Sequence, residues 1–301
     1  QLKSQNINCW GALTLGTEGQ QMTELAELAN VGIVGFTDGK PITNLSLIRR
    51  VLEYLQPIQK PVALWACDPG LGGKGVIRQG ANSMRFGLPG VPVMAESAPL
   101  SALLECIAEI GTPVHFMRIS TARSVELIRE AKARSIPITA STTWLHLLLD
   151  TNALSTYDPN LRLDPPLGNQ SDREALIQAV QEGVIDAIAV DHSPHTYEDK
   201  TVAFGEAPPG AIGLELALPL LWSNLVESGR WSALDLWQSL TVKPAQCLNQ
   251  SFQPQPLILF NPNEKWTVDR SNLRSLSSNT SWLNQSITGR VLEIFSTEVR
   301  E

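Results

Sequence analysis

Short apolar segments rich in β-branched residues alternate with helical patterns along most of this chain. The segments with strand character span residues 7–15, 33–36, 61–67, 114–119, 136–140 and 185–190. The helical patterns lie between and after them, at residues 22–29, 45–55, 98–110, 124–133, 172–182, 214–226 and 232–240. Strands that alternate with helices form βαβ units, so this order predicts an α/β protein with a parallel sheet.

Polar side chains follow several of these strands. Asp38 comes just after segment 33–36, and Asp191 follows segment 185–190 directly. Enzymes with a (β/α) barrel keep their active site at the carboxyl ends of the strands. The pattern therefore favours such a barrel, with residues 251–301 set apart by their Asn, Ser and Pro content and predicted to form a small β appendage.

The composition is that of an ordinary globular protein. Of the 301 residues, 43 % are hydrophobic and 18 % are charged, and the net charge is −7. This acidic balance argues against a nucleic-acid partner, and neither a membrane-spanning run nor a secretory leader is visible. The cysteines are too widely separated for a paired zinc motif, so we expect reduced thiols in a cytoplasmic protein: Cys9, Cys67, Cys106 and Cys247.

The most chemically suggestive stretch spans residues 184–215. Its apolar strand ends in Asp191 and His192, with His195 three residues further on and a Gly- and Pro-rich loop at residues 205–213. A carboxylate and two imidazoles at the end of a strand suit a catalytic site. The same residues also suit a polar strand end whose side chains are satisfied by hydrogen bonds, and the residues alone leave both interpretations open.

This stretch resembles the last barrel strand and substrate loop of dihydroorotases, which are cyclic amidohydrolases. Their pattern is close to D-H-A-P-H, then K, then A-P-x-G-x-x-G-L-E. The matching residues are Asp191, His192, Pro194, His195, Lys200, Ala207, Pro208, Gly210, Gly213, Leu214 and Glu215, and Ser193 replaces the Ala. Further matches at residues 35–41, 49–54, 87–96, 119–127 and 164–172 extend the resemblance over most of the chain.

The resemblance implies a (β/α)8 TIM barrel of the amidohydrolase type over residues 1–250 and a small β-sandwich appendage over residues 251–301. By this comparison the sequence starts at about the third barrel strand. A six-stranded arc cannot close and leaves two unpaired edges. We therefore expect either an upstream segment or another chain to cover the gap.

The resemblance also locates the family's metal site. Dihydroorotases hold zinc with an H-x-H pair on the first strand, a carboxylate on the fourth, a His on each of the next two and an Asp on the last. Asp38 and Asp191 match the two carboxylate positions, whereas Trp65 and Arg118 stand where the two His ligands belong. A guanidinium has no lone pair to offer a metal, so we expect no cofactor in this chain. Zinc would be required only if the protein is active. We expect Arg118 to pair with Asp191 or Asp38.

His115 lies three residues before Arg118 and therefore has the opposite parity on a strand. We expect it to face elsewhere rather than replace the lost ligand.

The resemblance implies a substrate site as well. It maps to Asp164, His195, Pro209 and Gly210. Where the family reads N-P-P-L-R, residues 164–168 read D-P-P-L-G, which replaces an Arg by Gly168 and adds a carboxylate. Without a metal, His192 and His195 are expected to pack or to support the loop.

Two classes of function follow from these residues. The first is a metal-free, non-catalytic dihydroorotase-like protein of pyrimidine biosynthesis, with Asp191 as a vestigial acid/base and with a structural role beside aspartate transcarbamoylase or in a homo-oligomer. The alternative is an active zinc dihydroorotase that interconverts N-carbamoyl-aspartate and dihydroorotate, or another cyclic amidohydrolase of the hydantoinase or allantoinase type. Neither class calls for a nucleic-acid or membrane partner.

Overall fold

A curled sheet of six parallel strands forms the centre of the computed structural model, which describes residues 7–251 and 257–295. The strands follow one another in the sheet in chain order: β1 (Trp10–Gly11), β2 (Gly35–Phe36), β3 (Val62–Leu64), β6 (Val114–Phe116), β7 (Ile138–Thr143) and β8 (Ala187–Ala189). Every neighbouring pair is parallel. This arrangement confirms the predicted (β/α)-barrel class, with β1 and β8 as the edges of the arc.

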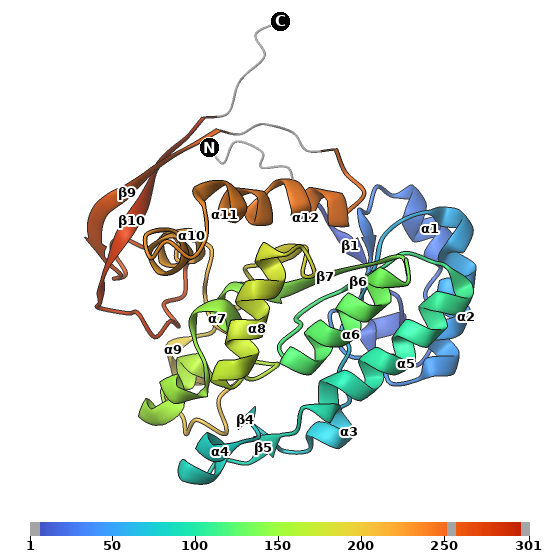
Figure 1. Ribbon diagram of the computed structural model, residues 1–301, viewed down its shortest axis with the longest axis horizontal. Coiled ribbons are helices and arrows are strands. Elements are labelled where there is room, and N and C mark those ends of the chain that lie inside the picture. Colours follow the sequence, from blue (N-terminus) through green and yellow to red (C-terminus); the bar gives the residue numbers. More distant parts are fainter. Residues whose placement is uncertain (1–6, 252–256, 296–301) are drawn as a thin grey trace, which may run out of the picture.

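Helices cover the outer face of this sheet (Figure 1). They are α1 (Leu25–Asn30), α2 (Leu45–Leu55), α5 (Met94–Ile110), α6 (Ala122–Ala133) and α8 (Gln170–Gln181). Two further helices, α11 (Ala233–Leu240) and α12 (Val242–Cys247), contact β8 and lie across the end of the sheet where the strands begin. Helix α2 begins where Asn44 accepts a hydrogen bond from the Leu47 amide, and it buries Ile48, Val51 and Leu55 on one face. The predicted bounds of α2 agree with the structure.

Five of the six strands are shorter than their predicted apolar segments, whereas β7 extends beyond its segment to Thr143. Strand β1 ends at Gly11, and the 3₁₀ turn η1 (Leu15–Thr17) begins at the last residue of the first apolar segment. After β6 and β8 the chain turns at Arg118 (φ 60°) and Asp191 (φ 49°), a left-handed conformation that is uncommon for residues other than glycine. Arg118 and Asp191 thus lie just beyond the ends of β6 and β8, where the backbone turns away from the sheet.

Two excursions were not apparent in the sequence. Between β3 and α5 lie α3 (Pro69–Gly72), β4 (Ile77–Arg78), α4 (Ala81–Arg85) and β5 (Gly90–Val91). Between β7 and α8 lie α7 (Trp144–Leu148), η3 (Thr151–Thr156) and η4 (Pro159–Leu161). Buried Arg78 ties the first excursion to the loop after β6 by donating to Ser120 Oγ at 2.7 Å, and the Glu96 carboxylate accepts the Ser120 amide at 3.1 Å.

The chain after β8 supplies α9 (Tyr197–Lys200), α10 (Ala217–Leu221), a π-helical turn η5 (Trp222–Val226) and, later, the strands β9 (Leu257–Thr267) and β10 (Ser286–Phe295). The predicted β appendage is an antiparallel two-stranded ribbon that packs beside α10 (Figure 1). The predicted domain boundary adjoins residues 252–256, which lie outside the described residues.

Candidate active site

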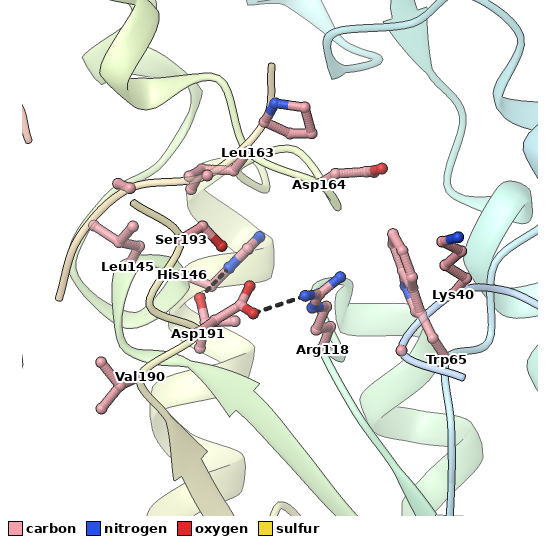
Figure 2. A pocket seen from close by; sticks show the side chains of 15 residues that line it. Lys40, Trp65, Arg118, Leu145, His146, Leu163, Asp164, Val190, Asp191 and Ser193 are labelled. Atoms are coloured by element: carbon pink, nitrogen blue, oxygen red, sulfur yellow. Dashed lines mark hydrogen bonds and ion pairs between the residues drawn. The ribbon is translucent and has the colours of Figure 1, made fainter. Parts of the chain in front are cut away.

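A cavity of about 210 Å³ lies at the carboxyl ends of β3, β6, β7 and β8. This is the end of the sheet where the sequence predicted the site. Charged side chains in its lining are Lys40, Arg118, Asp164 and Asp191, and Trp65 forms part of the wall. Figure 2 shows Arg118 and Asp191 reaching toward each other within it.

The Arg118–Asp191 ion pair dominates the base of the cavity. Arg118 Nη2 donates to Asp191 Oδ1 at 2.7 Å, and the two side chains keep 23 % and 31 % of their surface exposed. Both residues adopt the left-handed backbone conformation described above, which brings their side chains into the cavity from strands that are not neighbours. The expected pairing of Arg118 with a family carboxylate is thus confirmed, and the partner is Asp191.

Trp65 supports this ion pair from one side. The Arg118 guanidinium carbon lies 4.8 Å from the centre of the Trp65 ring, within the range of a cation–π interaction. The ring is only 8 % exposed, and its indole N–H has no hydrogen-bond partner among the described residues. Trp65 therefore forms a wall of the cavity and also contacts the cation of the ion pair.

Asp38 is placed apart from the ion pair. Its Oδ1 accepts the amides of Leu13 and Thr14 at 2.8 and 3.0 Å, and its Oδ2 accepts the Thr14 hydroxyl at 2.5 Å. The cavity lining includes the next two residues, Gly39 and Lys40, and does not include Asp38. In the described residues, this carboxylate holds the turn after β1.

His146 lines the cavity as a neutral group. Burial lowers its pKa to about 4, with a further lowering by the Arg78 charge. The ring nitrogens lie 2.7 Å from Thr143 Oγ1 and 3.3 Å from the Pro166 carbonyl oxygen. A neutral ring satisfies both contacts when Nε2–H donates to the carbonyl and Nδ1 accepts from the hydroxyl.

His115 lies in β6 outside this cavity and contacts Thr139 and Ser141 of β7 at 2.9 Å each. Burial lowers its pKa to about 4. The prediction that His115 faces away from the site is confirmed.

The loop after β8 is held by the residues that the family motif shares. His192 Nδ1 accepts the Gly213 amide at 3.1 Å, and His195 Nε2–H donates to the Pro209 carbonyl at 3.0 Å. Asp164, Pro209 and Gly210 line the cavity, whereas His195 stands behind them. The structure thus brings three of the four expected substrate-binding residues to the cavity.

Gly210 and Gly168 are fixed by packing. Gly210 has φ +125°, and a side chain there would collide with Ser193. A Cβ on Gly168 would lie 2.5 Å from the Cβ of Asp172 and 3.0 Å from the Ser120 carbonyl oxygen. The position that carries an Arg in the N-P-P-L-R pattern therefore has no room for a side chain in this protein.

Asn279 organises the same loop and was missed in the sequence. Its side chain is 5 % exposed, and its Nδ2 donates to the carbonyls of Ser193 and Gly210 at 3.0 and 3.2 Å. Its Oδ1 accepts the His195 amide at 3.2 Å. No local pattern marks this residue, because the loop it holds precedes it by about 70–85 positions.

Lys200 and Glu215, both part of the family motif, also act as loop supports. Lys200 donates to the Pro208 carbonyl at 2.6 Å, and burial lowers its pKa to about 8. Glu215 accepts the amides of Arg274 and Ser275 at 2.6 and 2.9 Å. Lys200 thus holds the loop that supplies Pro209 to the cavity, Glu215 holds residues 274–275, and neither charged side chain lines the cavity.

The side chains around the cavity do not form a suitable set of ligands for a zinc ion. A structural or catalytic zinc site takes His, Cys or carboxylate ligands, with at least three from the protein. Within residues 7–251 and 257–295, no group of three such side chains is close enough to hold a metal. Arg118 binds one oxygen of Asp191, and the Trp65 ring, which contacts Arg118, is not a metal ligand. Asp38 accepts a hydrogen bond from the Leu13 amide.

Solved structures with the same fold are cyclic amidohydrolases. The L-hydantoinase from Arthrobacter aurescens superposes with a TM-score of 0.80 at 20 % identity, over 96 % of this chain and 68 % of that one. A D-hydantoinase from a Thermus species superposes with a TM-score of 0.76, over 95 % of this chain and 66 % of that one. The fold is therefore that of the amidohydrolase TIM barrels, of which these strands form an arc.

The sequence comparison identifies the family more narrowly. A probable dihydroorotase-like protein from Synechocystis is 48 % identical over 299 residues, covering 96 % of this chain and 68 % of the relative. A dihydroorotase from Thermoanaerobacter is 35 % identical over 287 residues, covering 93 % and 67 %. No protein-family model matches the chain. The protein belongs to the dihydroorotase-like cyclic amidohydrolases, and it spans about two thirds of the length of these relatives.

Within the described residues, no helix is both long and apolar enough to cross a membrane.

Proposed function

We propose that this protein is a metal-free, non-catalytic dihydroorotase-like protein that serves pyrimidine biosynthesis through a partner. The observation that carries the proposal is the Arg118–Asp191 ion pair, stacked on Trp65. It stands at the two positions that the family resemblance assigns to a metal-binding His and to the catalytic Asp.

The chemistry of the reaction supports this proposal. Hydrolysis of a cyclic amide at neutral pH needs a strong nucleophile, and a bound zinc ion supplies one by lowering the pKa of water to about 7. A guanidinium is a fixed cation that remains protonated and has no vacant coordination position. Arg118 can neutralise Asp191, but it cannot replace zinc as an activator of water.

The remaining imidazoles offer no alternative base at the cavity. His146 has its two ring nitrogens engaged by Thr143 and Pro166. His192 and His195 both bind backbone groups of the loop. A general base must reach the proton that it removes, and these contacts engage the three imidazoles elsewhere.

An activity assay tests the proposal directly. The full-length protein is incubated with dihydroorotate and, separately, with N-carbamoyl-aspartate, with and without added zinc. The Thermoanaerobacter relative serves as the positive control for assay conditions. We expect no conversion in either direction, and turnover that depends on zinc would favour the alternative of an active dihydroorotase with ligands from outside the described residues.

The partner belongs to the same proposal. Non-catalytic members of the family assemble with aspartate transcarbamoylase, and the resemblance makes that enzyme the first candidate here. Size-exclusion chromatography with light scattering, on a mixture of the two proteins, tests for a joint complex. A protein that elutes alone, as a monomer or a homo-oligomer, would contradict this partner.

A further inference from the structure

The charges in the candidate active-site cavity fall into two pairs of opposite sign. Lys40 and Arg118 contribute two cations, and Asp164 and Asp191 contribute two carboxylates, while His146 is neutral. Figure 2 shows Asp164 across from the Arg118–Asp191 pair, with its carboxylate directed toward the side of the cavity that Trp65 forms. A ligand that carries both a positive and a negative group would therefore meet complementary charges without changing the balance of the site.

Asp164 provides the negative charge that would bind a positive group of the ligand. It is an exposed side chain in the lining, and it forms no hydrogen bond or ion pair with other described residues. Its neighbour Arg162 directs its Nη1 to the Leu163 carbonyl at 2.6 Å instead. Incomplete hydration in the cavity raises the pKa of Asp164, and the nearby Arg162 and Arg118 charges act against this rise. A carboxylate in this setting gains from an ammonium group that enters the cavity.

Arg118 provides the positive charge opposite Asp164, and Lys40 adds a second positive charge on the far side of Trp65 (Figure 2). Arg118 gives one N–H to Asp191, and the rest of its donor edge has no partner among the described residues. The contact with the Trp65 ring restricts the guanidinium, which reduces the entropy lost when Arg118 binds a carboxylate. Lys40 is exposed at the rim, where its Nζ donates to Thr17 Oγ1 at 3.0 Å.

We propose that this cavity binds a small zwitterionic α-amino acid, with the ligand ammonium at Asp164 and the ligand carboxylate at Arg118. The inference rests on the proposed function, because the Arg118–Asp191 pair replaces the metal that would otherwise hold a ligand. The cavity, at about 210 Å³, is smaller than the roughly 300–1,000 Å³ of sites for drug-sized molecules. Leu145, Leu163 and Val190 in the lining suit an uncharged, aliphatic side chain.

The charge balance also says which ligands the cavity disfavours. The two cations and two carboxylates of the lining sum to zero. A dianion would place a second negative group near Asp164 or Asp191, where like charges repel. The site therefore differs in its electrostatics from one built for N-carbamoyl-aspartate, which carries two carboxylates.

Titration calorimetry with L-valine as the probe tests the inference. N-acetyl-L-valine removes the ammonium charge and L-valinamide removes the carboxylate, so each tests one end of the cavity. We expect L-valine to bind and each derivative to bind at least about tenfold more weakly. Absence of L-valine binding up to about 10 mM, or equal binding of all three compounds, would overturn the inference.

A matched pair of variants assigns the ammonium end. Asp164→Asn removes the cavity carboxylate, and Glu198→Gln removes a carboxylate that is exposed and outside the cavity lining. We expect Asp164→Asn to weaken L-valine binding about tenfold and to leave N-acetyl-L-valine unaffected, whereas Glu198→Gln changes neither. Because Asp164 has no hydrogen-bond partner among the described residues, the variant should keep the melting temperature of the parent protein. Equal loss in both variants would contradict the assignment.

Zinc content, measured on the same preparation, separates the two proposals. A preparation that contains zinc refutes the metal-free function whatever L-valine does. A zinc-free preparation that does not bind L-valine refutes only the amino-acid site.

Discussion

Replacing Arg118 by Ala should destabilise the fold by about 1–3 kcal/mol, mainly because Asp191 then loses the ion pair with Arg118. An exposed ion pair contributes about 0–1 kcal/mol, and removing one partner of a fully buried pair costs about 3–5 kcal/mol. The Arg118–Asp191 pair lies between these limits, with exposed fractions of 23 % and 31 %. Loss of the contact with Trp65 adds about 0.5–1 kcal/mol.

The backbone provides a matched control for this prediction. Arg118 has φ 60°, a conformation that costs a residue with a Cβ about 1–2 kcal/mol and glycine little. Arg118→Gly removes the same ion pair but relieves that strain, so it should be up to about 1 kcal/mol more stable than Arg118→Ala. The difference between the two variants separates backbone strain from the loss of the guanidinium.

Urea denaturation of the parent and of both variants measures these free energies of unfolding. A double-mutant cycle with Asp191→Asn isolates the pairwise interaction, which we expect at about 1–2 kcal/mol. An Arg118→Ala protein with unchanged stability, or a coupling energy near zero, would refute the idea that Arg118 acts as an internal cation for Asp191.

Two further predictions concern the loop and the buried imidazoles. Asn279→Ala removes the donors to the carbonyls of Ser193 and Gly210, so stability should fall by about 2–3 kcal/mol. Amide hydrogen exchange around these two residues should accelerate, and unchanged exchange would contradict the role of Asn279. Burial lowers the pKa of His115 and His146 to about 4, so the unfolded chain binds more protons between about pH 4 and the ordinary value of 6.5. The free energy of unfolding should therefore fall as the pH drops from 6.5 to about 4. The His146→Gln variant should show a less steep decline. An equally steep decline in that variant would contradict the contribution of His146.

The sequence allowed the barrel arc to be predicted because each strand and helix has its own local pattern. Helix α2 shows this most clearly, since its apolar spacing and the Asn44 cap define both its bounds and its buried face. The Arg118–Asp191 pair was also foreseeable, because both residues follow parallel strands whose carboxyl ends meet at one edge. Its formation across the intervening strand β7 depends on the reach of an arginine side chain.

Other features depend on long-range contacts that leave no local pattern. Strands β4 and β5 have two residues each, too few for a periodicity to be visible. Asn279 donates hydrogen bonds to backbone carbonyls, and the type of residue that carries a carbonyl does not show in the sequence whether that carbonyl will be bound. The position of Asp38 depends on Leu13 and Thr14, because their amides donate hydrogen bonds to its carboxylate.

The most direct test of the metal-free account is the zinc content of the full-length protein, purified without chelators and measured by elemental analysis. The account predicts near-zero zinc per chain, because Arg118 and Trp65 stand at the two His-ligand positions of the family resemblance and the described residues do not suit a zinc ion. Zinc at about one or two ions per chain would contradict it, since a metal-bound hydroxide could then form.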